Sequence, residues 1–385
     1  MKAYACQDYA GGFSVAMRRA GFEITHKVEQ PDKFGLDAYR MNLALFGGPK
    51  TSAGHADDWP HASDINVLFG NPPCSAFSLL TQDPKFREGG SSGAEARQNH
   101  CMWDLIDMGV RLNPDVVMFE SVQRAGRSGE GRKLMLMLRD RLEQGTGVDW
   151  HLTHVFLNAL SVGGAQNRPR YFFVATKAGP VAMPPAKGYA RPLKDIIGDL
   201  VDRVESSGPY SWSNSPRMQR LAALAEVYWP QGRAADEALP VAREMGFEGH
   251  IGRSDAIRCP FTAWRWKWDA PPGVVTGGFM DDHVHPIRPR GFTHAEAARL
   301  MGLPDEYDLS GIVAAKTRGR SYYGKATSVE PAHWVARGIM GFLRNEDCEI
   351  IPQEVVGGTR EYMIDVTEAW RANRLGVQDS LFEDV

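Results

Sequence analysis

The stretch Asn71-Pro72-Pro73-Cys74-Ser75-Ala76-Phe77-Ser78 presents a cysteine directly after a turn, at the end of an apolar run. The run at residues 65–69 predicts a buried strand, and the segment from Gly70 to Pro73 excludes a helix and forces a turn at its carboxyl end. Cys74 is therefore expected where open α/β sheets place their active sites. A lone cysteine is more often buried and inert, so this stretch alone leaves a nucleophile and a structural thiol both open.

Two later segments also place polar residues beside apolar runs. Glu120 follows the run at residues 116–119, and Arg168 and Arg170 precede the run at residues 171–175. The ends of successive strands can converge on one pocket. A thiol, a carboxylate and a pair of guanidinium groups can therefore lie in one pocket.

At these positions the chain resembles the DNA cytosine-5 methyltransferases. The ordered signatures of that family, Pro-Cys-Gln, Glu-Asn-Val and Gln-x-Arg-x-Arg, stand here as Pro73-Cys74-Ser75, Glu120-Ser121-Val122 and Gln166-x-Arg168-x-Arg170. Residues 10–22 are similar to the opening Gly-rich turn and first helix of the family, and residues 290–304 to its late helix. The resemblance implies a Rossmann-like α/β methyltransferase large domain with an inserted small target-recognition domain.

Patterning along the chain predicts four segments. Residues 1–177 alternate strand-like and helical runs, as a catalytic βαβ series should. Residues 178–262 are punctuated by Pro, Gly and Ser and are expected to form the target-recognition domain. Residues 263–342 return to the catalytic domain and complete it. Residues 343–385 form a C-terminal extension without a recognisable signature.

Composition agrees with a globular protein that does not coat nucleic acid by bulk charge, since 43% of the residues are hydrophobic and the net charge is −3. The five cysteines form no Cys-x-x-Cys pair, so no metal site and no disulfide framework is expected. No apolar stretch is long enough to cross a bilayer and no signal peptide is recognised. We expect a cytoplasmic monomer without a membrane partner.

The resemblance also implies the chemistry. Cys74 would add to carbon 6 of a cytosine, because carbon 5 is a poor nucleophile until a covalent bond turns the ring into an enamine. Glu120, kept protonated by burial, would donate to ring N3 and read the amino group. Arg168 and Arg170 would clamp the base carbonyl and a neighbouring phosphate. Taken alone, Glu120 could equally be a solvated loop carboxylate.

A cytosine inside a duplex hides both carbons, so the target base has to be flipped out of double-stranded DNA. Residues 79–99 combine glycines with cations and are expected to close over DNA, although a plain linker has the same composition. Residues 253–267 mix cations with aromatic rings, which suits phosphates and unstacked bases but also a domain junction. The predicted DNA-binding residues are Ser78, Lys85, Arg87, Arg97, Gln166, Arg253, Arg258 and Thr276.

The cofactor turn departs from the family. The usual opening Asp-x-Phe-x-Gly-x-Gly-Gly, aligned on Gly11 and Gly12, places Ala5, Gln7 and Tyr9 where Asp, Phe and the first Gly are expected. A tyrosine there would crowd the backbone approach to the cofactor tail. The resemblance still assigns Glu29 to the ribose hydroxyls, and Asp57 or Asp58 to the adenine amine. The full predicted cofactor set is Gly11, Gly12, Phe13, Glu29, Asp57, Asp58, Pro73, Lys325 and Ala326.

The last block departs as well, because Lys325 stands where the family has asparagine in Gly-Asn-Ser/Ala-Val. An ammonium near a sulfonium is unfavourable unless a negative group lies between them, and a carboxylate on the transferred carbon would provide one. This pattern leaves S-adenosylmethionine and carboxy-S-adenosylmethionine both open as cofactors. Two other interpretations are a lysine that points outward and a register shifted to residues 326–329.

The sequence therefore predicts a DNA cytosine-5 transferase that moves a methyl or carboxymethyl group. Two alternatives stay open. A tRNA cytosine-5 methyltransferase has a similar fold, although the sizeable insertion at residues 178–262 favours DNA. A catalytically inactive DNA-binding relative would explain the altered cofactor turn, although such a module has no need of the Cys74 thiol.

Overall fold

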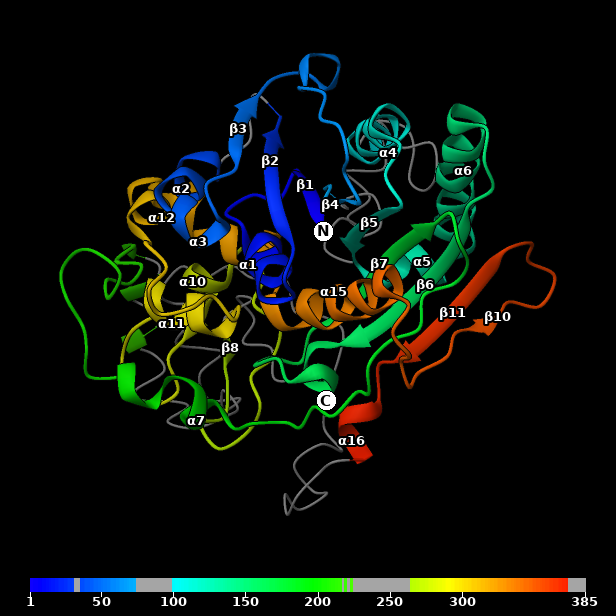
Figure 1. Ribbon diagram of the computed structural model, residues 1–385. Coiled ribbons are helices and arrows are strands. Elements are labelled where there is room, and N and C mark those ends of the chain that lie inside the picture. Colours follow the sequence, from blue (N-terminus) through cyan, green and yellow to red (C-terminus); the bar gives the residue numbers. More distant parts are fainter. Residues whose placement is uncertain (31–34, 74–98, 217, 220–221, 224–263, 373–385) are drawn as a thin grey trace. The chain divides into compact units, whose positions relative to one another are not determined.

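The computed structural model describes residues 1–30, 35–73, 99–216, 218–219, 222–223 and 264–372 (Figure 1). The chain divides into two compact units. The first unit consists of Met1–Gly164, Pro169–Gly188 and Ala326–Trp370. The second unit consists of Ala165–Arg168, Tyr189–Lys325 and Arg371–Val385.

Among the described residues of the first unit, nine strands form one sheet in the order β10-β11-β6-β7-β5-β4-β1-β2-β3. Neighbouring strands are parallel except at β7, which is antiparallel to β5 and β6, and at β10, which is antiparallel to β11. The strands are β1 (Lys2–Cys6), β2 (Glu23–Glu29), β3 (Lys50–Ala53), β4 (Val67–Gly70), β5 (Val116–Ser121), β6 (His151–Asn158), β7 (Pro169–Thr176), β10 (Gln353–Glu354) and β11 (Glu361–Val366).

Helices accompany this sheet. Their bounds are α1 (Gly12–Arg19), α2 (Leu36–Met41), α3 (Leu43–Phe46), η1 (Ala56–Asp58), α4 (His100–Leu112), α5 (Gln123–Arg127), α6 (Gly129–Thr146), η6 (Ala159–Val162), α15 (Val329–Arg344) and α16 (Ala369–Ala372). The second unit contains α7 (Leu193–Ile197), η7 (Gly198–Leu200), β8 (Trp264–Arg265), α10 (Phe279–Asp282), β9 (His283–Val284), α11 (His294–Leu300), α12 (Ser310–Ala314), α13 (Lys316–Arg320) and α14 (Tyr322–Lys325).

Strand alternation creates an apolar surface on each side of the sheet, since successive side chains point to opposite faces. Leu68 of β4 belongs to a buried cluster with residues of α4 and α6. Its neighbour Phe69 instead contacts Phe13 of α1, with ring centroids 5.0 Å apart. Helices α1 and α15 pack against one another (Figure 1). The central strands are therefore covered on both faces, as their nearly continuous apolar sequences require.

The Rossmann-like α/β fold predicted from the sequence is confirmed. Strand β4 begins two residues later than the apolar run at residues 65–69, and α1 begins within residues 10–22, which resemble the opening turn and first helix of the family. None of the helices in the described part of the chain is both long enough and apolar enough to cross a membrane.

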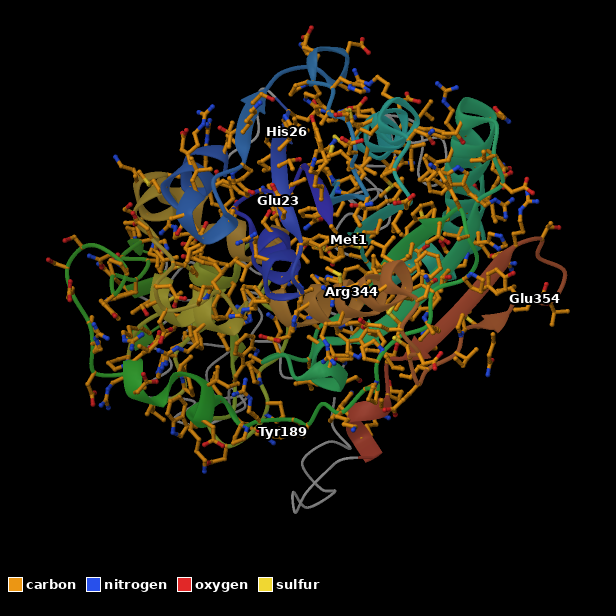
Figure 2. The ribbon with its side chains drawn as sticks, viewed as in Figure 1. Met1, Glu23, His26, Tyr189, Arg344 and Glu354 are labelled. Carbon is orange, nitrogen blue, oxygen red and sulfur yellow. The ribbon has the colours of Figure 1, made fainter. Side chains whose placement is uncertain are left out.

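The C-terminal extension adds two strands to the sheet, which its sequence did not reveal. Strand β11 pairs in parallel with β6, and β10 carries the exposed Glu354 (Figure 2). Buried Glu361 of β11 accepts two hydrogen bonds from Arg132, at 2.7 and 2.8 Å, and contacts His154 Nε2 at 2.9 Å. Burial opposes the charge of Glu361, but these partners outweigh it and lower its pKa to about 2.

Candidate active site

The predicted strand before Cys74 is present in the first unit as β4. A side chain at Gly70, the last residue of β4, would bring a Cβ within 2.1 Å of the Cys6 carbonyl oxygen, so glycine permits β1 and β4 to approach. Beyond it, buried Asn71 donates from Nδ2 to Thr327 Oγ1 at 2.8 Å. Cys74 itself lies outside the described residues. The described chain ends at half-buried Pro73, one residue before it.

Glu120 lies near the carboxyl end of β5 and is buried. Its Oε1 forms an ion pair with Arg170 Nε of the adjacent strand β7 at 2.6 Å, and its Oε2 accepts a long hydrogen bond from Thr327 Oγ1 at 3.4 Å. A guanidinium favours the charged form of a carboxyl group. Glu120 is therefore a partnered carboxylate in this structure and not a solvated loop residue, whereas the predicted chemistry needs its protonated form.

Residue 327 connects this group to the start of α1. A Cβ on Gly12 would lie 2.3 Å from the Thr327 carbonyl oxygen, so the opening turn touches the segment before α15. Thr327 thus contacts Gly12, Asn71 and Glu120, which are far apart in the sequence. Within the first unit, Thr327 therefore connects the opening turn, the segment after β4 and the end of β5.

The opening turn has the left-handed backbone conformation that favours glycine, although Tyr9 replaces the expected glycine. Gln7 has φ of 58°, Tyr9 has φ of 46° and Gly11 has φ of 92°, all in the left-handed region. Tyr9 is buried and stands where the family has glycine. A non-glycine residue pays a steric cost in this conformation, so surrounding contacts have to hold the turn.

Asp8 supplies such contacts, and sequence reasoning missed it. Its carboxylate accepts hydrogen bonds from the backbone N–H groups of Phe13 and Ser14, at 3.1 and 2.8 Å, at the start of α1. Burial raises the pKa of Asp8 to about 6, although Lys27 and the hydrogen bonds with Ser14 and Phe13 oppose the rise. An Asp six residues before a Ser is a weak sequence signal, and the capping geometry is visible only in the folded turn.

Glu29 ends β2 and has unequal oxygens. Its Oε2 accepts from Lys27 Nζ at 2.6 Å and from the Tyr9 backbone N–H at 3.2 Å. Its Oε1 is buried and has no hydrogen-bond partner among the described residues. A buried carboxylate oxygen without a donor is costly unless a ligand supplies one. This oxygen fits a ribose hydroxyl, the role that the resemblance assigns to Glu29.

The other predicted cofactor residues of the first unit differ in exposure. Asp57 and Asp58 are exposed on η1, and Ala326 is buried. The Phe13 ring is in the core, 5.9 Å from the ring centroid of Phe172. A Cβ on Gly11 would lie 2.4 Å from the Phe46 ring, so this glycine is required by packing as well as by its φ. Aromatic side chains therefore pack against the opening turn.

Gln166 and Arg168 belong to the second unit and are buried there. Gln166 Oε1 accepts from Val275 N at 2.9 Å, and Arg168 donates to the carbonyl oxygens of Val275 at 2.8 Å and Gly324 at 3.0 Å. These contacts hold main-chain segments, with half-buried Thr276 next to them. The base, phosphate and DNA contacts assigned to these residues stay predictions.

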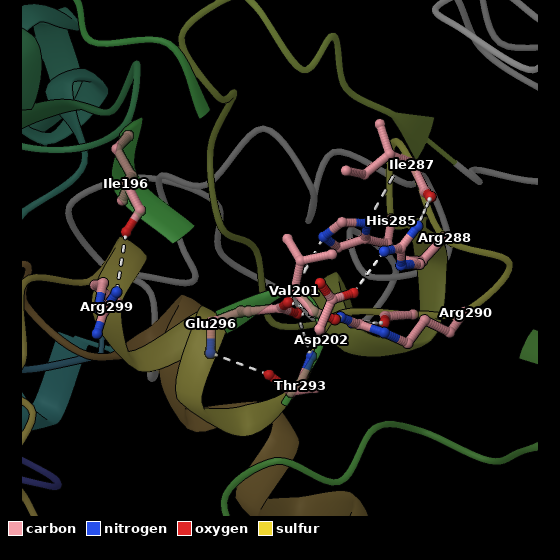
Figure 3. Close-up of polar contacts among 11 residues, drawn as sticks. Ile196, Val201, Asp202, His285, Ile287, Arg288, Arg290, Thr293, Glu296 and Arg299 are labelled. Carbon is pink, nitrogen blue, oxygen red and sulfur yellow. Dashed lines mark hydrogen bonds and ion pairs between the residues drawn. The ribbon is translucent and has the colours of Figure 1, made fainter. Parts of the chain in front are cut away.

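The late motif at residues 290–304 has a structural role in the second unit (Figure 3). Arg290 donates to both oxygens of Glu296, at 2.9 and 2.8 Å. Thr293 and Glu296 form a reciprocal capping box at the start of α11. The family pattern in this block therefore specifies a helix terminus and a buried ion pair.

Lys325, the last residue of α14, is exposed in the second unit. Its predicted role toward the cofactor stays a prediction. The residues Cys74, Ser78, Lys85, Arg87, Arg97, Arg253 and Arg258 lie outside the described residues. The expected absence of a metal also stays a prediction. The described residues do include one group of potential metal ligands, His100, Cys101 and Asp104, whose ligand atoms lie within 4.8 Å of one another.

Strand order, the turn after β1 and the acidic residue that ends β2 together define a Rossmann-like methyltransferase fold. A family model described as C-5 cytosine-specific DNA methylase matches residues 4–340, and the chain belongs to this family. The family recognised from the sequence motifs is confirmed. C-5 methyltransferases use S-adenosylmethionine and act on DNA.

Curated relatives are distant. The Type II methyltransferase M.Sau96I of Staphylococcus aureus is 24% identical over 349 residues, covering 87% of this chain and 74% of that protein. The Type II methyltransferase M.XorII of Xanthomonas oryzae pv. oryzae is 24% identical over 413 residues, covering 97% and 92%. The chain is thus a divergent member of the family.

Solved structures show the same fold. A structure described as a DNA modification methyltransferase encoded within an E. coli prophage matches with a TM-score of 0.61 at 18% identity, covering 89% of this chain and 99% of that one. A Spodoptera frugiperda DNMT2 variant matches with a TM-score of 0.57 at 15% identity, covering 88% and 99%. At these identities the likeness concerns the fold alone.

Proposed function

We propose that this protein transfers a one-carbon-type group to carbon 5 of a DNA cytosine, with Cys74 as the nucleophile. The contact group of Asn71, Glu120, Arg170 and Thr327 is the observation that carries this proposal. Cys74 follows Asn71-Pro72-Pro73 directly, so chain connectivity ties the thiol to this group. A purely DNA-binding module would have no need of a thiol at Cys74.

In the proposed first step the Cys74 thiolate forms a bond to carbon 6. The electron pair of the carbon 5–carbon 6 double bond shifts to the carbon 4–carbon 5 bond, the pair of the carbon 4–N3 double bond moves to N3, and N3 takes a proton from Glu120. The product is an enamine whose carbon 5 is nucleophilic. Transfer to carbon 5 would break the bond from the transferred carbon to sulfur and release S-adenosylhomocysteine. N3 would return its proton to Glu120, the carbon 5 proton would leave to solvent, and its electron pair would re-form the double bond to carbon 6 as the Cys74 thiolate is expelled.

Glu120 has to arrive at this step protonated, although it is paired with Arg170 in this structure. We propose that the bound base displaces Arg170 from Glu120, so that the guanidinium turns to the base carbonyl and the carboxylate takes up a proton from solvent. Closing the site against water would favour that uptake, because desolvation disfavours a lone carboxylate. Arg168 would act by holding the segments at Val275 and Gly324.

The cofactor, when bound, supplies the electrophilic group. The turn at Gly11, Gly12 and Phe13 would support its amino-acid tail, and Glu29 Oε1 would accept from a ribose hydroxyl. Asp57 or Asp58 would contact the adenine amine. Pro73, Lys325 and Ala326 complete the proposed set.

The transferred group is proposed to include carboxymethyl as well as methyl. Replacement of the family asparagine by Lys325, together with the altered turn at Gln7 and Tyr9, supports this proposal. Purified enzyme given both cofactors should form 5-carboxymethylcytosine, and Lys325→Asn should shift the product toward 5-methylcytosine. Mass spectrometry of the product nucleosides measures both. Formation of 5-methylcytosine alone by both proteins would make Lys325 an ordinary surface lysine.

The nucleophile is tested by trapping. Wild-type enzyme and duplex DNA with 5-fluorocytosine at the target should form a stable covalent adduct, and Cys74→Ser should lose the adduct while still binding the duplex. An adduct that survives in the Cys74→Ser protein would move the nucleophile to another cysteine. Cys348→Ser provides the matched control and should keep the adduct.

Double-stranded DNA with a flipped cytosine is the proposed substrate, and residues 178–262 are proposed to select its sequence. Exchanging this segment for that of a relative should change the site preference. The fold likeness to a DNMT2 protein keeps the tRNA alternative as the second candidate. Transfer of label to tRNA but not to duplex DNA, by the same preparation, would decide for that alternative.

A further inference from the structure

A fully buried ion pair lies on β2 without an evident structural need for it. The side chains of Lys27 and Glu29 are 0% and 1% exposed, and Lys27 Nζ lies 2.6 Å from Glu29 Oε2. Removing two charges from water costs more than one ion pair usually returns. A hydrophobic pair would serve a strand interior equally well, so the charges call for a functional reason.

Only one of the two Glu29 carboxylate oxygens receives hydrogen bonds among the described residues. Both donors to Glu29, Lys27 Nζ and the Tyr9 backbone N–H, go to Oε2. Oε1 is buried without a hydrogen-bond partner among the described residues. Lys27 Nζ is itself held in place, since it also donates to the Val28 carbonyl oxygen at 3.3 Å and lies 5.6 Å from the centroid of the Tyr39 ring.

Asp8 adds a second negative group to this environment. It is buried at the start of α1, and Lys27 is the charge that favours its ionised form. One ammonium thus interacts with two buried carboxylates, Asp8 and Glu29. Its loss would leave both without this cation.

We propose that Lys27 is a positioning residue for nucleoside recognition, which holds the Glu29 carboxylate turned so that Oε1 accepts a ribose hydroxyl. This proposal rests on the cofactor site proposed above and names a residue outside its predicted set. If Lys27 is lost, the Glu29 side chain loses its shortest contact and can adopt another rotamer. Oε1 then no longer lies where the hydroxyl needs an acceptor.

A merely structural ion pair makes a different prediction from a positioning residue. Loss of a structural pair weakens the binding of every ligand in this site to the same extent. Loss of a positioning residue for Oε1 weakens mainly those ligands that carry the hydroxyl. The comparison of a ligand with its deoxy analogue therefore separates the two roles.

The experiment measures binding to the full chain by isothermal titration calorimetry. The ligands are S-adenosylhomocysteine, which is the product from either proposed cofactor, and its 2′-deoxy and 3′-deoxy analogues. In the wild type, removal of the contacted hydroxyl should weaken binding about tenfold or more, as expected for a hydrogen bond to a charged acceptor. In Lys27→Met, the parent ligand should bind about tenfold more weakly and the ratio to the deoxy analogue should fall to about one to threefold.

Matched variants complete the design. Lys27→Arg keeps the charge and should restore part of the ratio. Lys50→Met removes an exposed lysine of neighbouring β3 and should leave both affinities at wild-type values. If Lys27→Met does not fold, as judged by circular dichroism, Lys27→Gln provides a neutral side chain that can still donate to Glu29, and it should show the same loss of discrimination.

A Lys27→Met or Lys27→Gln protein that keeps the wild-type ratio between parent and deoxy ligands would overturn the proposal. Wild-type binding that is indifferent to both hydroxyls would overturn it as well, because Glu29 would then not contact the ribose. Neither result bears on transfer to carbon 5, which the nucleoside analysis and the 5-fluorocytosine trap test separately.

Discussion

Two buried histidines should make the second unit sensitive to mild acid. Burial lowers the pKa of His283 to about 3, and burial together with Arg320 lowers that of His294 to about 4. Both histidines are therefore neutral in the folded state, whereas in the unfolded chain they take up a proton near their ordinary pKa of 6.5. The unfolded state binds more protons below that value, so the stability falls as the pH falls.

The magnitude follows from the two pKa values. Between about pH 7.5 and about pH 5.5, each histidine should lower the free energy of unfolding by about 1.3 kcal/mol, or about 2.6 kcal/mol together. Asp8 of the first unit works in the opposite direction, because its pKa is raised and its ionised form is disfavoured at neutral pH. The informative quantity is therefore the difference between wild type and a histidine variant at the two pH values.

Urea denaturation followed by tryptophan fluorescence provides the assay. Trp266 lies against His283, with ring centroids 4.9 Å apart, and reports on this part of the second unit. His294→Gln removes the ring that contacts the Tyr323 hydroxyl at 3.0 Å and should lower stability at both pH values. Its loss between the two pH values should nevertheless be about 1.3 kcal/mol smaller than that of the wild type.

The exposed His61 offers a control, since His61→Gln should keep the pH dependence of the wild type. The reasoning is refuted if His294→Gln and His283→Gln both lose as much stability between the two pH values as the wild-type protein. In that case the two rings would be protonated in the folded state as readily as in the unfolded chain.

Three further outcomes are expected. Gly12→Ala should lower the free energy of unfolding by about 2 kcal/mol or more and reduce transfer, because the added Cβ would lie 2.3 Å from the Thr327 carbonyl oxygen. Urea denaturation and label incorporation measure the two effects, and a variant as stable and active as wild type would contradict this packing. Glu361→Gln should cost about 3 kcal/mol by the same denaturation assay, since it leaves buried His154 and the more exposed Arg132 without their carboxylate partner. Glu354→Gln on the exposed strand β10 should cost less than about 0.5 kcal/mol, and equal losses would show that the contacts of Glu361 do not stabilise the fold. Glu120→Gln should slow single-turnover transfer about a hundredfold or more with DNA binding retained, and an unchanged rate would exclude Glu120 as the proton donor.

Much of the sheet was predictable from local sequence. Four apolar residues followed by Gly70 and two prolines define a buried strand and a turn with few alternatives, and the run before Glu120 does the same for β5. The family followed from motifs whose order along the chain is itself sequence information. These features depend on neighbouring residues, whose steric and hydrophobic preferences act whatever the rest of the chain does.

The tertiary structure alone decided how distant groups are paired. Asn71 and Thr327 are 256 residues apart and share a hydrogen bond, and Glu361 lies in a segment whose sequence had no readable signature. The one-sided contacts of Glu29 with Lys27 likewise depend on rotamers in a folded turn. Spacing along the chain cannot specify such pairs, because burial makes a polar contact strong only after the whole sheet has closed around it.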